Sequence, residues 1–401
     1  MDVNQSLPLL AGLSPAQFMH RHWQKKPLLV RQAIPGFQPL LNRAALFKLA
    51  AGEQVESRLI VQQAKGWRMK QGPFAPRGLP PLNQKAWTLL VQGVDLHDAG
   101  AHELLQKFRF VPDARLDDLM ISFATEGGGV GPHFDSYDVF LLQASGRRRW
   151  RIGRQKDLSL QDGVPLKILR NFEPEQEFVL ESGDMLYLPP RYAHDGVAEA
   201  ATSGEGCMTY SIGFRSPARG ELAAELLQRL AEFSEDDMQG NAPAGRRAST
   251  APDIYRDPGQ EATAAPAALP AELAAFASQA VQDALKDPLA LACALGEYMT
   301  EPKPSLWFDE AADEWDAEAA QAGRAGIRLD ARTRMMYDAN HIFINGESYR
   351  ARGADATLMR RLADSRSLAP RELRKAGASA MGLLGDWHDA GWLRLVPSAN
   401  S

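Results

Sequence analysis

The chain has 401 residues, a formal net charge of −5 and two cysteines, Cys207 and Cys293. This length predicts two or three domains. The mild acidity argues against a general binder of nucleic acid or anionic membranes, and two distant cysteines exclude a disulfide framework and a zinc-type cysteine cluster. We find neither the basic start and uninterrupted apolar stretch of a signal peptide nor an apolar run long enough to span a membrane, so we expect a cytoplasmic protein.

The first half of the chain has the composition of a strand-rich domain. Residues 1–215 combine glycine, aromatic residues and short apolar runs that turn signals interrupt. Near the start, Ser14-Pro15 predicts a helix, with serine as the cap and proline in the first turn.

The middle of the chain is predicted to be helical over residues 216–300. Leucines at helical spacing follow Ser216-Pro217, and further helices are expected over 270–286 and up to Met299. Between them, residues 238–268 are rich in glycine, proline, alanine, serine and threonine, which predicts a flexible linker. Amphipathic helices that cover no sheet often pair with another chain, so we expect a homodimer.

The last hundred residues, 301–401, are predicted to form a small α+β unit. Asn345-Gly346 between two short apolar runs is a strong signal for a β-hairpin. Helices are expected near 354–364 and 370–386, and a final strand near 392–396. The unit has 14 basic and 15 acidic residues, a net charge of −1. We therefore expect no direct reading of nucleic acid.

The glycine-rich segment Gly127–Phe140 carries the candidates for a metal site. Residues two apart on a strand face the same side, so His133 and Asp135 point into one cavity, with Tyr137 beyond them. An imidazole and a carboxylate at this spacing can supply two ligands of a facial triad. His194 follows a strand that two prolines end, and it is the candidate for the third ligand.

Two imidazoles and one carboxylate suit Fe(II) and leave three positions open, two for a 2-oxo acid and one for O2. Such a co-substrate needs a cation for its second carboxylate. In the alternating strand Gly146–Ile152, Arg148 shares its side with the apolar Trp150 and Ile152, so we expect it to point inward and bind that carboxylate.

A second alternating strand begins at Asp118. Asp118, Met120 and Ser122 fall on one face of it, which we expect to face the cavity. Ser122 is a second candidate for binding the co-substrate, and Thr209 and Ser211 on the last strand are further ones. Asp118 and Met120 would offer a carboxylate and a flexible apolar surface near the mouth of the pocket.

Three parts of the chain closely resemble the bacterial ribosomal oxygenases of the JmjC group: Phe18–Leu29, Gly127–Ile152 and Gly183–His194. The resemblance covers essentially the whole chain. It implies a mixed α+β fold, with a double-stranded β-helix of the JmjC/cupin jelly-roll type, then the helical dimerisation region, then a winged-helix-like domain.

The resemblance also implies an activity, the Fe(II)- and 2-oxoglutarate-dependent hydroxylation of a protein, with O2 as the second co-substrate. The substrate would be the large-subunit ribosomal protein L-sixteen, modified at C3 of an arginine. In such an enzyme the iron ligands would be His133, Asp135 and His194, and Arg148 would bind 2-oxoglutarate. The residues that would clasp the substrate arginine are Asp118, Met120 and Tyr137.

Two alternatives stay open. A JmjC enzyme that hydroxylates another residue, or a lysine demethylase, would use the same iron site. A winged-helix nucleic-acid-binding module with an inert cupin is a different class. It would be expected to have lost a triad residue and to carry a clearly basic C-terminal domain, and the sequence has neither feature.

Overall fold

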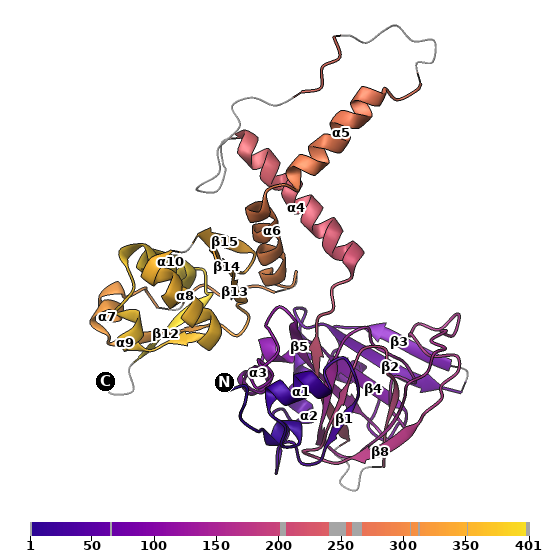
Figure 1. The fold of residues 1–401 in the computed structure, drawn as a ribbon. Coiled ribbons are helices and arrows are strands. Elements are labelled where there is room, and N and C mark those ends of the chain that lie inside the picture. The colour runs from indigo at the N-terminus through magenta and orange to yellow at the C-terminus, as the bar shows by residue number, and fades with distance from the viewer. Residues whose placement is uncertain are drawn as a thin grey trace. The chain divides into compact units, whose positions relative to one another are not determined.

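The computed structural model describes residues 2–64, 66–200, 206–239, 254–258, 267–304, 306–311, 313–350 and 352–397. The linker expected at 238–268 lies largely outside these ranges. The chain divides into two compact units, Met1–Ser216 and Pro217–Ser401 (Figure 1). Across the described residues, no helix combines the length and the apolar character that crossing a membrane requires.

The first unit is built on two antiparallel sheets. The larger has eight strands in the order β1-β9-β6-β11-β5-β4-β2-β3, and the smaller has the order β10-β7-β8. In these orders the strands of the larger sheet are Leu28–Val30, Met185–Leu188, Val139–Ser145, Cys207–Phe214, Leu116–Ala124, Trp87–Val91, Ser57–Gln63 and Gly66–Gln71. Those of the smaller sheet are Ala193–Ala198, Arg148–Gly153 and Gln176–Leu180.

Side-chain alternation gives the larger sheet two different faces. One face packs under the N-terminal helices, where Leu119, Ile121 and Phe123 of β5 share an apolar core with Phe18 of α1 (Figure 1). Ser14 caps α1 by accepting the Gln17 N–H at 3.2 Å, as predicted. The helices and 3-10 helices of this unit are α1 (Pro15–Arg21), α2 (Arg43–Leu49), α3 (Ala99–Gln106), η1 (Pro8–Leu10), η2 (Pro76–Gly78) and η3 (Val94–Leu96).

The other face of the larger sheet packs against the smaller sheet. Val139 and Leu186 of the larger sheet join Trp150 and Leu180 of the smaller one in a second apolar core. Two antiparallel sheets packed face to face in this way confirm the predicted jelly roll. The polar residues of the inner faces therefore lie inside the fold, where they can form a site.

The second unit begins with three helices, α4 (Arg219–Gln239), α5 (Ala271–Ala284) and α6 (Pro288–Thr300). Helix α6 packs on the hairpin that follows, because Glu297 accepts a hydrogen bond from the Ser348 hydroxyl at 2.6 Å and Gly296 lies against the Phe343 ring. The remaining elements are α7 (Ala317–Ala322), α8 (Gly353–Ser365), α9 (Pro370–Leu373), α10 (Ala378–Asp389), and the sheets β16-β12-β17 (Ser367–Leu368, Ala325–Leu329, Leu393–Pro397) and β13-β14-β15 (Met335–Tyr337, His341–Ile344, Glu347–Arg350).

The hairpin predicted around Asn345-Gly346 is present as β14 and β15. The helical segment predicted near 370–386 forms two helices, α9 and α10, with a break between them. The break has a tertiary cause, because the Gly377 N–H donates to Asp355 of α8 at 2.9 Å. A Cβ at position 377 would lie 2.7 Å from that carboxylate, so a larger residue would require the Asp355 side chain to shift.

Candidate active site

Three side chains that are far apart in the sequence converge in the first unit. His133, Asp135 and His194 offer ligand atoms that all lie within 4.8 Å of one another. The segment with His133 runs beside β10, because His133 and His194 exchange backbone hydrogen bonds of 2.9 and 2.8 Å. The carboxylate oxygen Oδ2 of Asp135 is 3.6 Å from Nε2 of His194. The fold therefore brings together the three residues that the sequence singled out as metal ligands.

Hydrogen bonds orient both imidazoles. Nδ1 of His133 is 2.8 Å from the Gly131 carbonyl, and Nδ1 of His194 is 2.9 Å from the Tyr192 carbonyl. A carbonyl can only accept, so each Nδ1 carries the hydrogen and each Nε2 keeps a free lone pair. Burial, helped by the charge of His133 and opposed by that of Asp135, lowers the pKa of His194 to about 4. His194 is therefore neutral at pH 7, as a metal ligand must be.

The glycines before His133 let this segment run close to β10. A Cβ at Gly129 would lie 2.5 Å from the Gly196 carbonyl oxygen. Gly131 has a φ of +78°, and a Cβ there would lie within 2.8 Å of the Ile168 and Trp67 side chains. Trp67 and Ile168 therefore pack against Gly131, which is two residues before His133. Sequence reasoning missed both, because nothing in their local pattern ties them to residue 131.

Arg148 lies on the inner face of β7, as its alternation predicts. Its exposed fraction is 4%, whereas the side chains of Arg149 and Arg151 are 45% and 43% exposed. In the β7–β10 pairing, Ile152 lies opposite His194 and Arg148 lies opposite Ala198. Arg148 is four residues from Ile152 on β7, so it shares a face with His194. The two residues lie about 14 Å apart along the strand direction.

The guanidinium of Arg148 is buried, and no described residue offers it an anion. Its Nε and Nη2 atoms have no hydrogen-bond partner among the described residues. Its Nη1 reaches only the Gly196 carbonyl, at 3.5 Å, and its guanidinium carbon lies 5.8 Å from the centre of the Trp150 ring. An unpaired buried charge is costly, and a carboxylate would satisfy both free nitrogens. The site thus fits one carboxylate of a diacid whose other end reaches toward the three ligand residues.

Polar side chains also line the inner face of the larger sheet. The Ser122 hydroxyl donates to the Thr209 carbonyl at 3.3 Å, and the Thr209 hydroxyl donates to Oε1 of Gln143 at 2.9 Å. Ser122, Thr209 and Ser211 thus lie on the face that the sequence predicted. Sequence reasoning missed Gln143, which is fully buried in β6. The available signal was a glutamine within an otherwise apolar run, since a buried amide needs polar partners inside the fold.

Asp118, Met120 and Tyr137 differ in their exposure to solvent and in their contacts within the fold. Asp118 is buried, and its Oδ2 accepts the Gly93 N–H at 2.9 Å, so the residue also has a structural role. Met120 is half-buried on the same face of β5. Tyr137 is 39% exposed, and burial of its hydroxyl end, together with the charges of Asp135 and Asp118, raises its pKa above the usual value. Both carboxylates are therefore close enough for their charges to act on this hydroxyl, and the charge of Arg58 opposes them.

The chain matches two family models. Residues 103–222 match the JmjC domain and residues 283–394 match the ROXA-like winged helix. The first range contains every candidate site residue named above. The second includes α6, in agreement with the packing of that helix on the hairpin.

Solved and curated relatives resemble the chain over most of its length. The ribosomal protein uL16 3-hydroxylase of Escherichia coli (strain K12) is 33% identical over 344 residues, which are 82% of this chain and 84% of that protein. An X-ray structure of E. coli YcfD superposes with a TM-score of 0.79 at 28% identity, over 95% of this chain and 98% of that one. A structure of YcfD, a ribosomal oxygenase from E. coli, in complex with cobalt and 2-oxoglutarate gives a TM-score of 0.75 at 28% identity, over 95% and 97%. Because the chain is 33% identical to the uL16 3-hydroxylase over more than two thirds of both chains, it belongs to the JmjC-domain ribosomal oxygenases.

Proposed function

We propose that the chain is an Fe(II)- and 2-oxoglutarate-dependent dioxygenase that hydroxylates an arginine at C3 in the large-subunit ribosomal protein uL16. The observation that carries this proposal is the buried, unpaired guanidinium of Arg148 on the same inner face as His194. The identity to the E. coli uL16 3-hydroxylase supports the choice of substrate. When bound, Fe(II) would activate O2 and 2-oxoglutarate would supply two electrons by oxidative decarboxylation, so that one oxygen atom ends in succinate and the other enters a C–H bond.

The residues of the chain would divide the work as follows. His133, Asp135 and His194 would hold the metal through Nε2, a carboxylate oxygen and Nε2. Arg148 would bind the far carboxylate of 2-oxoglutarate, and the Ser122 hydroxyl would be a second contact for it. The two Nδ1 hydrogen bonds to backbone carbonyls keep both imidazoles in the required orientation.

The mouth of the pocket suits a guanidinium. Asp118 would pair with the substrate arginine, Tyr137 would offer its ring and hydroxyl, and Met120 would pack against the aliphatic part of the side chain. The charge of Asp118 acts on the Tyr137 hydroxyl, which supports a shared role for the two residues. Because Asp118 also holds the Gly93 N–H, its carboxylate is fixed before the substrate arrives.

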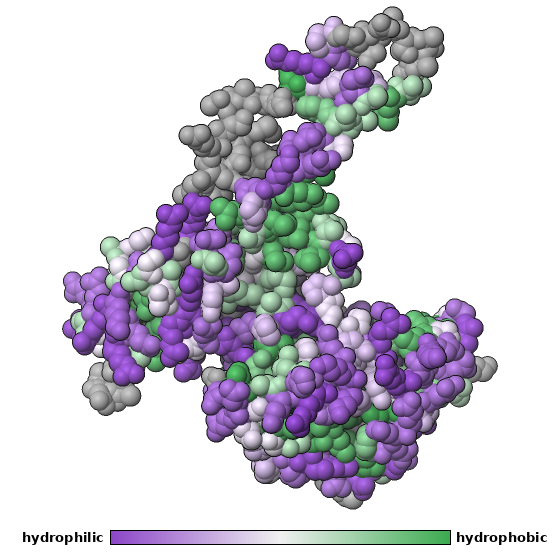
Figure 2. Space-filling view, in the orientation of Figure 1, coloured by the Kyte–Doolittle hydropathy of each residue, from purple (hydrophilic) through white to green (hydrophobic). Residues whose placement is uncertain are grey.

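We also infer that the protein acts as a cytoplasmic homodimer, with a catalytic domain over 1–215, a dimerisation region over 216–300 and a winged-helix-like domain over 301–401. The support is an apolar surface on the helices of the second unit (Figure 2). The exposed aliphatic side chains on α4, α5, α6 and the turn between α5 and α6 include Leu227, Leu273, Val281, Leu285, Leu289, Leu291 and Leu295. Two copies related by a two-fold axis would cover this surface with itself.

The dimer has a direct test. Leu291→Asp combined with Leu295→Asp places two charges one turn apart on α6, and we expect sedimentation to change from a dimer to a monomer. A wild-type monomer at micromolar concentration would contradict the proposal.

The activity is tested by incubating the purified protein with Fe(II), 2-oxoglutarate, ascorbate and a peptide from uL16 of the same organism. We expect the peptide to gain the mass of one oxygen atom on an arginine. The gain should vanish for His133→Ala and persist for His20→Ala, a matched change at an exposed histidine. Turnover of 2-oxoglutarate without modification would reject the substrate. Loss of a methyl group from a methyl-lysine peptide would favour the demethylase alternative.

A further inference from the structure

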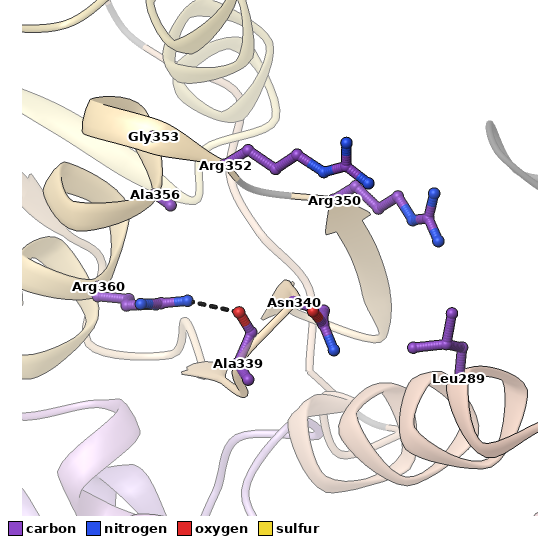
Figure 3. Close-up of a pocket in the computed structure, with 8 residues that line it drawn as sticks. All are labelled: Leu289, Ala339, Asn340, Arg350, Arg352, Gly353, Ala356 and Arg360. Atoms are coloured by element: carbon purple, nitrogen blue, oxygen red, sulfur yellow. Dashed lines mark hydrogen bonds between the residues drawn. The ribbon is translucent and has the colours of Figure 1, made fainter.

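The second unit contains a cavity of about 410 Å³ that the proposed oxygenase reaction does not use (Figure 3). Three arginines line it, Arg350 at the end of β15, Arg352 just before α8 and Arg360 within α8. Asn340 adds an amide, and no lining residue is acidic. We call this cavity the arginine pocket.

Arg360 is held in place on one side of the pocket. Its Nη2 donates to the backbone carbonyls of Ala339 at 2.8 Å and Asp338 at 3.3 Å, and its guanidinium carbon lies 5.7 Å from the centre of the Tyr337 ring. Its Nε is buried and has no partner within the described part of the chain. These contacts fix the side chain but leave its positive charge without a carboxylate.

Arg350 and Arg352 are exposed, and Figure 3 shows that both extend in the same direction from the chain. Neither forms an ion pair with any of the described residues. The nearby carboxylates have other partners, because Asp338 accepts from the backbone of Asn340 and His341 and Asp355 accepts from Gly377. Three guanidinium groups thus line one cavity, and no described carboxylate forms an ion pair with them.

The backbone adds to this positive potential. Helix α8 has 13 residues, and its N-cap, Arg352, makes no side-chain cap hydrogen bond. Gly353 has a φ of +65° and no heavy atom near the position of a Cβ, so the first turn of the helix is open to a ligand. Free N–H groups at the start of a helix favour anions.

We propose that the arginine pocket binds phosphate groups, with Arg350 and Arg352 closing on a ligand against the fixed Arg360. Guanidinium groups match phosphate oxygens in pairs, and three of them suit a dianion or two adjacent phosphates better than a single carboxylate. The phosphates can belong to a free nucleoside polyphosphate or to an RNA backbone. Backbone contacts carry no sequence information, which agrees with the net charge of only −1 over residues 301–401.

The test uses the full-length protein and two probes. Inorganic pyrophosphate is titrated by calorimetry, and a labelled single-stranded RNA is titrated by fluorescence anisotropy at several salt concentrations. The variant is Arg350→Gln with Arg352→Gln, which removes two exposed charges. The matched control is Arg328→Gln with Arg394→Gln, two exposed cross-strand neighbours in the other small sheet of this unit, so that the net charge is the same.

We expect at least one probe to bind, with an affinity that falls at least about 10-fold in the variant and not in the control. Pyrophosphate binding without RNA binding would identify a free polyphosphate as the ligand. RNA binding whose logarithmic salt slope falls by about 1.4 in the variant would identify a phosphate backbone. No binding of either probe, or equal losses in variant and control, would overturn the proposal. Because hydroxylation is measured separately, failure here leaves the proposed oxygenase function untouched.

Discussion

The two faces of β7 carry the same kind of charge in opposite situations. On the outer face, Arg149 pairs with Glu177 and Glu199, and Arg151 pairs with Asp195. On the inner face, one residue away, Arg148 is buried and has no acidic partner among the described residues. The fold neutralises the arginines that water could already solvate and leaves unpaired the one that water cannot reach.

The difference separates charges with a structural role from charges kept for a ligand. A surface ion pair contributes little to stability, and its loss is tolerated. A buried cation without a partner destabilises the folded chain, so its presence indicates a ligand that completes it. In the arginine pocket Arg350 and Arg352 are solvated, so their lack of ion pairs costs little. There the indication of a ligand is that three guanidinium groups line one cavity.

The largest effect is expected at the metal ligands. His133→Ala removes one of three donors, so we expect Co(II) binding, followed by its visible absorption, to be lost, and 2-oxoglutarate turnover to fall to the level of the metal-free protein. Retention of stoichiometric Co(II) by this variant would show that the triad is not the metal site. His20→Ala should bind Co(II) as the wild type does.

The next effect tests the inner face of β7. Arg148→Gln removes the two free nitrogens that would bind a carboxylate, so we expect KM for 2-oxoglutarate to rise on the order of 100-fold, equivalent to about 3 kcal/mol of charged hydrogen bonding. Without co-substrate, the variant should be no less stable than the wild type, because an uncompensated buried charge has been removed. A lower melting temperature with an unchanged KM would make Arg148 a structural residue, and the contrast between the inner and outer faces of β7 would then not concern co-substrate binding.

A paired buried charge should behave in the opposite way. Asp184 is 5% exposed and accepts from Arg31 at 2.6 Å and from the N–H groups of Gln32 and Glu181 at 2.9 and 3.1 Å. We expect Asp184→Ala to lower the free energy of unfolding by about 3 kcal/mol, with little change in KM. Urea denaturation measures the loss, and Asp162→Asn, at a side chain that is 94% exposed, is the control.

The same carboxylate predicts a pH dependence. Burial alone would raise the pKa of Asp184, but the N–H groups of Gln32 and Glu181 and the Arg31 guanidinium outweigh it, so the pKa lies below its usual value. A depressed pKa contributes stability that is complete above the unfolded value of about 3.9 and is lost as pH falls through the folded value. The stability difference between wild type and Asp184→Ala should therefore narrow below about pH 4. A difference that widens there would contradict this sign.

Much of the candidate site was predictable because strand alternation is local. The positions of Asp118, Met120 and Ser122 on β5 and of Arg148 on β7 follow from a period of two. His133 and Asp135 follow from the same rule. His194 is 61 residues further along, and only its place after a strand ended by prolines pointed to it.

The parts that could not be predicted depend on contacts between distant segments. Trp67 reaches Gly131 from β3, and Asp355 interrupts a helix 22 residues later. The arginine pocket is a third case, because its arginines share a cavity only after α8 packs on the β13–β14 turn. In the sequence, Arg360 stands beside Arg361 as part of a basic cluster, yet Arg361 pairs with Glu372 and lies outside the pocket lining.

The smallest effect is expected on the outer face of β7. Arg149→Gln removes a charge from an exposed side chain, and Glu177 and Glu199 stay hydrated when it is gone. We expect the melting temperature and KM for 2-oxoglutarate to match those of the wild type, measured by thermal denaturation with and without 2-oxoglutarate and by steady-state turnover. Because this variant carries the same chemical change as Arg148→Gln one residue away, it separates the direction of the side chain from the loss of charge. A rise in KM equal to that of Arg148→Gln would mean that net charge, and not the inner face, governs co-substrate binding.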